Sequence, residues 1–530
     1  MTTAPPEHQT RPTLAHRQIM LLMGGLMTGM LLAALDQTIV GTALPTIVGD
    51  LGGLDHLAWV VTSYLLASTA STPLYGKLGD MYGRKPLFLA AILIFLAGSM
   101  LAGLAESMGE LIAFRGIQGI GAGGLMVGAQ AIIADIVPPR ERGRYTGLIG
   151  AVFAIASVAG PLLGGFLVQS LSWRWVFYVN LPLGIVAVLV VFFRLHLRTP
   201  QNRHEIDYLG AALLAAAAAL LVLLTTWGGT QYAWGSPTVV VLAVVTVCLL
   251  VAFVWQERRA AEPIIPLELF ASGIFRVASG VGFVIGLAMF GAIIFIPLFL
   301  QLVYGVSPTS SGLRMLPMIT GLLVTSIVSG RLITRIGRYR AFPIAGTAIT
   351  AIGMFLLSRL GVDTPPGLAS VYMLVLGLGL GLVMQVIVLV VQNDAPRRDI
   401  GAATSTATFL RSMGGSLGVA LFGAIFASRL HDQLQALPRA TAARFSGGLD
   451  IRPSQVHALP PAQRHGFLVA FVHALSPVFL VGAAVTGVAF VLALALREVP
   501  LRDTLGPADA QAAEVAAGGS GAEALVADSA

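Results

Sequence analysis

Long apolar runs dominate the chain, and polar residues gather in short stretches between them. Fourteen runs approach the length of about 20 mostly apolar residues that a helix needs to cross the hydrocarbon of a bilayer. They begin near Ile19, Leu57, Pro86, Glu110, Tyr145, Trp175, Tyr208, Pro237, Phe275, Ser311, Ala341, Gly367, Ser405 and Phe467. A single apolar run can be the core helix of a soluble protein, but fourteen in series leave no polar faces for water to solvate. The pattern predicts an all-α integral membrane protein with 14 transmembrane helices.

The basic residues indicate how these helices are oriented. With the N-terminus in the cytoplasm, most of the 32 Lys and Arg residues fall in loops on that side. The short loops on the other side hold only Arg174, Arg314 and Arg359. Because Lys and Arg concentrate in cytoplasmic loops, we expect a multi-pass protein of the cytoplasmic membrane with both termini in the cytoplasm. The outer loop at 428–466 also carries arginines, but long loops escape this bias.

The sequence contains an internal repeat. Residues 76–84 align with residues 330–338, and the spaced glycines of 119–123 recur at 377–381. Two like halves are typical of a transporter with a substrate site near the midplane, at their interface. The predicted domains are a disordered cytoplasmic N-terminus (1–16), an N-terminal six-helix bundle (17–200), two linker transmembrane helices (201–260), a C-terminal six-helix bundle (261–500) with the long outer loop, and a disordered cytoplasmic tail (501–530). We expect the linker helices to be peripheral, because they have no repeat partner.

Composition narrows the possible functions. Hydrophobic residues make up 56% of the chain and charged residues only 11%, whereas a soluble protein carries about a quarter charged residues. The net charge of +7 follows from the loop placement and gives no reason to expect a nucleic-acid partner. Cys248 is the only cysteine, so we predict no disulfide, no CxxC redox pair and no cysteine metal site.

Two glycine-rich stretches match the sequence patterns of enzyme motifs but lack the structural context that those motifs require. Residues 119–124 fit G-x-G-x-x-G and residues 414–418 fit G-x-S-x-G, but both lie inside predicted membrane helices without the strand that either motif needs. Small-residue faces that let helices approach closely explain both better. We therefore expect no enzymatic activity, no metal and no cofactor.

The loop after the second predicted helix is more specific. It places three glycines and four charges in one tight cytoplasmic turn: Gly76, Lys77, Gly79, Asp80, Gly83, Arg84 and Lys85. A plain positive-inside loop would explain the three basic residues, but it would explain neither the acid nor the glycines.

Other motifs accompany this loop. They are Arg115 with residues 118–121, the Gly160, Pro161, Gly164 and Gly165 set, and the runs at 35–45 and 173–182. Together with the loop and the fourteen predicted spans, these motifs resemble those of the major facilitator superfamily, specifically its branch of drug/proton antiporters. The resemblance implies the major facilitator fold, and it has two departures. Ala156 stands where the family's Gly-Pro motif has an earlier glycine, which bears on the bending of the fifth helix, and Thr334 replaces the acid in the second copy of the loop.

Asp36 and Arg115 are charges inside apolar runs, where an ionisable group is costly and needs a reason. Counting residues from the outer ends of their helices places both about 8 to 10 Å deep, so they can pair if the helices are neighbours. A static ion pair or two residues wetted by a cavity would fit these positions. The functional hypothesis is that the pair couples transport to protons, with Asp36 as the proton carrier. Burial favours its protonated form and a nearby arginine its ionised form. The resemblance supports this hypothesis.

The resemblance also implies that Asp80 engages the start of the thirteenth helix as part of a cytoplasmic gate. Four residues are candidates for the substrate cavity: Gln37, Gln118, Gln385 and Arg411. For Arg411, contact with an acidic group of a substrate and a bond between helices both fit. Glutamines often join helices, and methionines such as Met384 serve ordinary packing as well as adaptable cavities.

We predict a proton-coupled antiporter that exports lipophilic drugs or antibiotics by alternating access. Its partners would be a small lipophilic substrate, neutral or singly cationic, together with protons and membrane lipid, and it would function as a monomer driven by the proton gradient. A nutrient/proton symporter and a lipid or amphiphile exporter on the same fold are the alternatives. A membrane enzyme lacks a catalytic constellation in the sequence, and an ion channel would not give a saturable flux that depends on the proton gradient.

Overall fold

The computed structural model describes residues 16–52, 56–195, 205–229, 231–435, 456 and 459–501, and their regular elements are helices. Most of the two ends and of the outer loop, where we predicted disorder or irregular structure, lies outside the described residues. The long helices of the first half are α1 (His16–Leu51), α2 (Leu57–Tyr82), α3 (Arg84–Leu104), α4 (Met108–Ile136), α5 (Pro139–Ser170) and α7 (Asn180–Arg194), the last preceded by the short α6 (Trp175–Tyr178). The linker pair is α8 (Tyr208–Trp227) and α9 (Pro237–Glu257). The second half contains α10 (Gly273–Val303), the short α11 (Pro308–Arg314), α12 (Leu316–Ile336), α13 (Ala341–Leu357), α14 (Pro366–Asp394), α15 (Ile400–Gln435) and α18 (Pro461–Leu494).

The fourteen predicted spans coincide with helices. Twelve segments are long and apolar enough to cross a membrane by their own composition. The other two predicted spans are α2, whose last turns carry Lys77 and Asp80, and α13, which is apolar but has only 17 residues. The all-helical prediction is therefore confirmed. Several ends differ, because a helix continues past the hydrocarbon wherever its backbone hydrogen bonds do: α1 runs on to Leu51, and α15 starts at Ile400.

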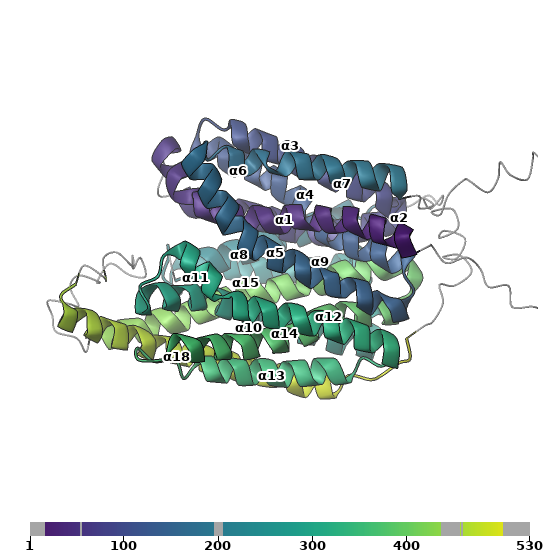
Figure 1. Cartoon of the computed structure of the whole chain (residues 1–530). Coiled ribbons are helices and arrows are strands. Elements are labelled where there is room, and N and C mark those ends of the chain that lie inside the picture. Colours follow the sequence, from purple (N-terminus) through teal and green to yellow (C-terminus); the bar gives the residue numbers. More distant parts are fainter. Residues whose placement is uncertain are drawn as a thin grey trace, which may run out of the picture.

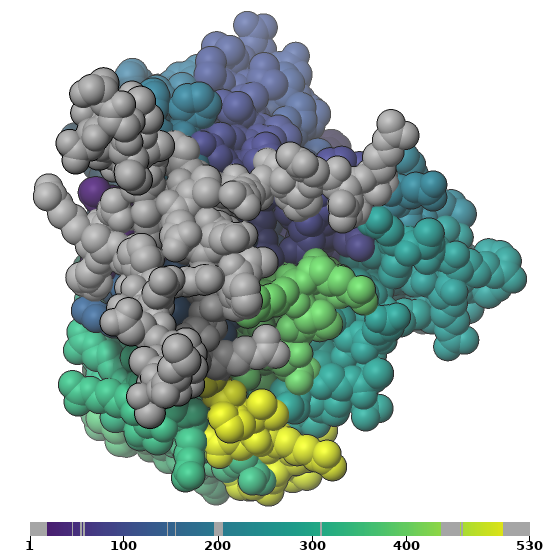
Figure 2. Space-filling model, turned by 90° about the vertical axis from the view of Figure 1, so that its right-hand side faces the viewer, coloured from purple at the N-terminus to yellow at the C-terminus, as the bar shows by residue number. Residues whose placement is uncertain are grey.

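The helices form two halves with separate cores (Figure 1). In Figure 2, which looks along the helices, the first half lies above the second, and the start of α1 and the end of α18 lie on the same side of the molecule in Figure 1. One core joins side chains of α1 to α7, and the other joins side chains of α10 to α18.

Equivalent glycines make equivalent contacts in the two halves. A Cβ on Gly119 would meet the Tyr64 carbonyl of α2, and one on Gly377 would meet the Met318 carbonyl of α12. Gly121 and Gly379 likewise approach the backbone of the third helix in each half. Small residues allow such close backbone packing. The glycines of 119–124 are therefore packing positions, as expected, and the packing follows the sequence repeat.

The linker pair is only partly peripheral, which differs from our expectation. Helix α9 is largely exposed, as a lipid-facing helix would be. Helix α8 instead packs on α2 of the first half and on α15 of the second. A small core of its own joins Leu214 and Leu221 of α8 to Phe409 and Met413 of α15. Helix α8 therefore covers the seam where the two halves meet.

Candidate functional site

Asp36 lies at the centre of a buried polar network in the first half. Its carboxylate pairs with the Arg115 guanidinium and also accepts hydrogen bonds from the amides of Gln118 (2.8 Å) and Asn180 (3.2 Å). All four side chains are at most 1% exposed, so the ion pair is sealed from water in this conformation. The structure therefore brings together Asp36 and Arg115, which the sequence had placed at similar depth.

Arg115 is held on several sides. Its guanidinium donates to the Gln118 side chain (2.7 Å) and to the Val60 carbonyl (3.3 Å), and it lies over the Tyr64 ring at 4.2 Å from the centroid. A cation over an aromatic face gains further electrostatic stabilisation, more so when it is desolvated. The side chain is therefore fixed opposite the Asp36 carboxylate by contacts from α2 and α4.

The outer members of the network were missed by sequence reasoning. Asn180 also donates to Ser99 (3.0 Å), whose hydroxyl donates to the Phe177 carbonyl (2.8 Å). Asn180 stands in the 173–182 run that contributed to the resemblance, but only the fold shows that α7 and α3 bring it and Ser99 to Asp36. Gln118, which we predicted for the substrate cavity, is fully buried in this network in the described conformation.

Two glycines of the Gly-Pro motif on α5 lie against α1 close to Asp36. The Thr38 hydroxyl of α1 also donates to the Ala156 carbonyl of α5 (2.9 Å). A Cβ on Gly160 would collide with the Thr38 hydroxyl, and one on Gly164 with the Thr42 hydroxyl. These two glycines join α5 to α1, and α5 is one continuous helix despite Ala156.

Gly165, from the same motif, has open space where its Cβ would be. It therefore has no packing role in this conformation, and the close approach of α5 to α1 rests on the other two glycines.

Asp80 joins the two halves at the end of the molecule where α1 begins. Its carboxylate accepts backbone hydrogen bonds from Gly401 (3.0 Å) and Ala402 (2.8 Å), in the first turn of α15. It also pairs with Arg84 at 2.9 Å. The unpaired N–H groups of a helix start carry partial positive charge, so an acid is stabilised there. This is the contact with the thirteenth span that the resemblance implied.

The remaining loop residues support this contact or extend it. Gly76 lies so close to Ser405 and Gly401 that a Cβ would collide with both, and Gly83 has φ +94°, a backbone conformation that favours glycine. A Cβ on Gly79 would meet only Arg84, at 3.7 Å, so that glycine is not required by packing.

The three basic residues of the loop have separate partners. Arg84 bridges Asp80 and Asp135 of α4, which ties the loop to its own half. Lys85 donates to the Phe192 carbonyl at the end of α7 (2.8 Å). Lys77 lies 3.8 Å from Glu262, in the segment that follows the linker pair.

A second seam joins the halves through α5 and α12. Gly143 and Gly330 approach so closely that a Cβ on either would meet the backbone of the other. Gly330 is the repeat equivalent of Gly76, so the same position serves the seam in both halves. Arg140 donates to the Thr334 carbonyl at 3.2 Å. Thr334, which stands where the first copy has its acid, bonds its hydroxyl within its own helix instead. Thr334 therefore does not repeat at this seam the contact that Asp80 makes with the start of α15.

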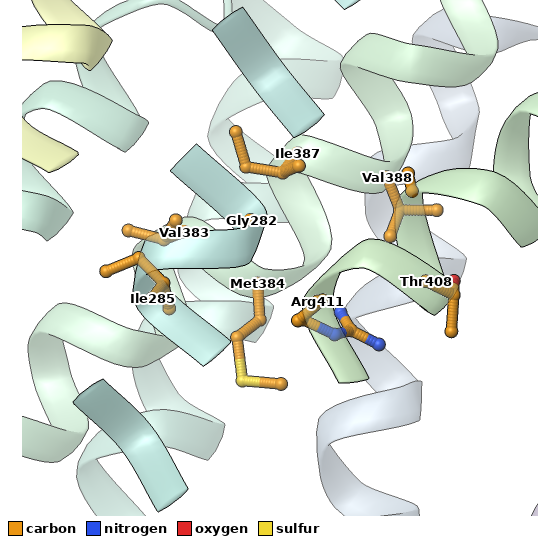
Figure 3. Close-up of a pocket in the computed structure, with 9 residues that line it drawn as sticks. Gly282, Ile285, Val383, Met384, Ile387, Val388, Thr408 and Arg411 are labelled. Atoms are coloured by element: carbon orange, nitrogen blue, oxygen red, sulfur yellow. The ribbon is translucent and has the colours of Figure 1, made fainter. Parts of the chain in front are cut away.

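Arg411 lies apart from these contacts, beside a small cavity in the second half. Figure 3 shows the cavity between Gly282 and Ile285 of α10, Met384 and Val388 of α14, and Arg411 of α15. Its volume is about 10 Å³, which is room for about one water molecule. The other proposed cavity residues are separate: Gln37 is exposed one position after Asp36, and Gln385 is buried and does not line this space.

The comparisons with known proteins agree with this geometry. A profile of the Major Facilitator Superfamily matches residues 26–208 and 206–419. Over 513 residues, 96% of this chain and 74% of the relative, the sequence is 44% identical to an uncharacterized MFS-type transporter of Mycobacterium tuberculosis. Over 444 residues, 82% of each chain, it is 39% identical to the multidrug transporter protein MdtP of Bacillus subtilis. The proton:xylose symporter XylE has the same fold, with a TM-score of 0.60 over 94% of this chain and 99% of XylE, at 13% identity. The chain therefore belongs to the Major Facilitator Superfamily of membrane transporters.

Proposed function

We propose that the protein is a proton-coupled antiporter that exports lipophilic compounds across the cytoplasmic membrane by alternating access. The relatives named as a multidrug transporter and as a multidrug resistance protein support export as the activity. The observation that carries proton coupling is the sealed Asp36 and Arg115 pair, a titratable acid buried in a membrane-spanning bundle. Both termini would lie in the cytoplasm. Because one chain contains both halves and both seams, it would work as a monomer.

The Asp36 side chain has two alternative states, a carboxylate that needs Arg115 and a protonated acid that does not. As a carboxylate it accepts three hydrogen bonds, and removing Arg115 from it would leave a buried charge, at a cost of about 3 to 5 kcal/mol. Once protonated, it no longer needs the guanidinium. Loading a proton therefore releases α1 from α4, and losing the proton draws them together again.

A contiguous set of contacts links this site to the interface between the halves. Thr38, half a turn after Asp36, bonds to α5 through the Ala156 carbonyl. The other end of α5 forms the seam with α12 at Gly143 and Gly330. A shift of α1 on protonation is thereby passed to a helix that spans from the proton site to the seam. Opening that seam, together with the Asp80 contact, would expose the interior to the cytoplasm.

The proton gradient supplies enough energy for this work. Moving one elementary charge inward through 100 mV releases about 2.3 kcal/mol. Exchange of one proton for one neutral molecule can therefore support a concentration ratio of about 50, before any pH difference is added. This is sufficient for efflux of a compound that leaks back through the bilayer slowly.

The test is gradient-driven efflux in proteoliposomes with a panel of lipophilic dyes. Wild-type protein should extrude dye only when protons can flow in the opposite direction. Asp36→Asn should abolish the dependence on the proton gradient while dye still exchanges for dye across the membrane. Glu106→Gln, which neutralises an exposed acid of the same half, is the matched control and should behave as wild type. Normal gradient dependence in the Asp36→Asn variant would overturn the assignment, and dye entering together with protons would identify a symporter.

A further inference from the structure

Arg411 is a charged residue deep in the membrane-spanning part of the second half. It is the twelfth residue of α15, which places it about 16 Å along the helix from Ile400. That distance is about half the thickness of the hydrocarbon core. In Figure 3 its guanidinium points away from Ile285 and Val383, toward the side on which a helix of the first half runs.

The guanidinium has no protein partner in the part of the chain that the structure describes. No hydrogen bond, ion pair or ring contact joins it to a described residue. Arg84 and Arg115, which are buried, each pair with an aspartate, whereas the partly buried Arg411 has no such partner among the described residues. A charge in hydrocarbon without a partner is costly and marks a functional position in most membrane proteins.

The acidic side chains that could have neutralised the charge of Arg411 already pair with other residues. Asp36 is paired with Arg115 and sealed in the first half, and Asp80 is bound to the start of α15 and to Arg84. Among the described residues, the charge left free at the depth of Arg411 is therefore positive. Complementary charge is what selects a ligand at a site of this kind.

Neutral polar atoms without partners lie on the same two helices. The Thr408 hydroxyl lines the cavity one turn before Arg411, and it is buried without a hydrogen-bond partner in the described structure. The same holds for the amide oxygen of Gln385, next to Met384 on α14. A buried polar group without a partner calls for an explanation such as a water or a ligand. A hydroxyl donor beside a guanidinium suits an acidic group, and the Met384, Ile387 and Val388 side chains suit an apolar body.

We propose that Arg411 binds the acidic group of the exported compound, so that the substrates are lipophilic organic anions such as carboxylates or sulfonates. This inference rests on the proposed export function and replaces the expectation of neutral or singly cationic substrates. The acidic group lies on Arg411 with Thr408 as a second donor, and the apolar part lies against α14. In the described conformation the cavity holds about one water molecule, so the site is collapsed, and the substrate enters when the halves part.

The test is equilibrium binding to the full-length protein in nanodiscs, with three fluorescent probes of different charge. Dansyl-phenylalanine is an anion, its methyl ester is neutral, and ethidium is a cation. Wild-type protein should bind the acid at least tenfold more tightly than the ester. Arg411→Gln should weaken binding of the acid about 10- to 100-fold, the effect of losing a charge-assisted hydrogen bond, and should leave the ester unchanged. Arg411→Lys should restore most of the affinity for the acid.

The controls separate recognition from folding. Arg359→Gln removes an exposed arginine from the same half and should match wild type for all three probes. Equal binding of acid and ester by the wild type would overturn the proposal without any variant. Parallel loss of acid and ester in Arg411→Gln, with a lower Tm, would assign Arg411 to helix packing instead.

Binding requires no gradient, so the two proposals can fail separately. If no gradient drives efflux of any probe but acid binding depends on Arg411, the export function falls and the anion site stands. If Arg411→Gln still exports and binds the acid as wild type does, the anion site falls and the exporter stands.

Discussion

Replacing Asp80 by asparagine tests whether the loop after α2 holds the two halves together. Asparagine has the same shape but no charge. Its amide can accept one of the two backbone hydrogen bonds from Gly401 and Ala402, and it turns an N–H group toward the other. The Arg84 contact contributes little to the difference between conformations, because Arg84 is four residues from Asp80 in the same half and stays with it when the halves part.

The size of the effect follows from the two contacts that opening would break. An acid at a helix start contributes about 0.3 to 2 kcal/mol, and a hydrogen bond to a charged group about 1.5 to 3 kcal/mol. Water replaces part of both interactions when the seam opens. We therefore take about 2 kcal/mol as the net free energy by which Asp80 favours the closed seam. The Asp80 side chain is only 5% exposed, so solvent screens this bias little. The substitution should therefore shift the equilibrium by a factor of about 30 toward the state in which the seam between α2 and α15 is open.

The assay is a spin-label distance measurement between the two halves at the end of the molecule where α1 begins. Cys248 is the only cysteine and is exposed, so Cys248→Ser gives a clean background. Labels at exposed Arg194 and Arg497 report the separation of the two bundles. Asp80→Asn should increase the fraction of long distances and slow the efflux of substrate.

The matched control is Asp135→Asn, which removes another acid paired with Arg84 but leaves in place the backbone hydrogen bonds from Gly401 and Ala402 to Asp80. It should leave the distance distribution as in wild type. If Asp80→Asn leaves both the distances and efflux unchanged, the carboxylate does not act as a latch. If both variants shift the distances equally, the effect belongs to Arg84 and the proposed mechanism of the latch is wrong.

Three further predictions address the other contacts. Gly160→Ala should lower the free energy of unfolding by about 1 to 3 kcal/mol, because its Cβ would collide with Thr38. Adding Thr38→Ala should restore part of this loss, as measured by thermal unfolding. Equal stability of Gly160→Ala and wild type would contradict the close packing. Glu262→Gln should change the free energy of unfolding by less than about 1 kcal/mol, because its 3.8 Å ion pair with Lys77 is partly exposed. A large drop in Tm would instead show that this ion pair anchors the linker helices. Asn180→Ala removes one donor to the buried carboxylate and should lower the free energy of unfolding by about 1.5 to 3 kcal/mol; a Tm equal to that of wild type would show that this hydrogen bond does not stabilise the network.

The membrane fold could be predicted from the sequence because its cause is local. Each span must bury its backbone polar groups within itself, so length and apolar composition alone identify it. Even α2 and α13, the two weaker cases, were found, because each contains an apolar run that approaches the length of a membrane span. The ends were less accurate, since the start of α15 depends on the loop before it and on what its first amides contact.

The candidate site could be predicted only in part. Asp36 and Arg115 stood out because charges in apolar runs are rare, and their similar depth suggested a pair. Asn180 and Ser99 did not stand out, because a neutral polar residue in a helix is compatible with many roles. The bond from Gln118 to Asp36 was not foreseen for the same reason: the position of Gln118 in the chain does not say which face of α4 it occupies relative to α1.

The sequence by itself determined where the membrane-spanning helices lie, their repeat, and which residues carry charge into the membrane. It could do so because apolar length, basic loops and buried charges are each governed by the cost of placing polar groups in hydrocarbon. Only the tertiary structure decided which charges are satisfied: it gave Asp36 three donors, gave Asp80 the start of α15, and left Arg411 without a partner among the described residues. Pairing depends on how helices far apart in the chain pack together, and no local pattern encodes that arrangement.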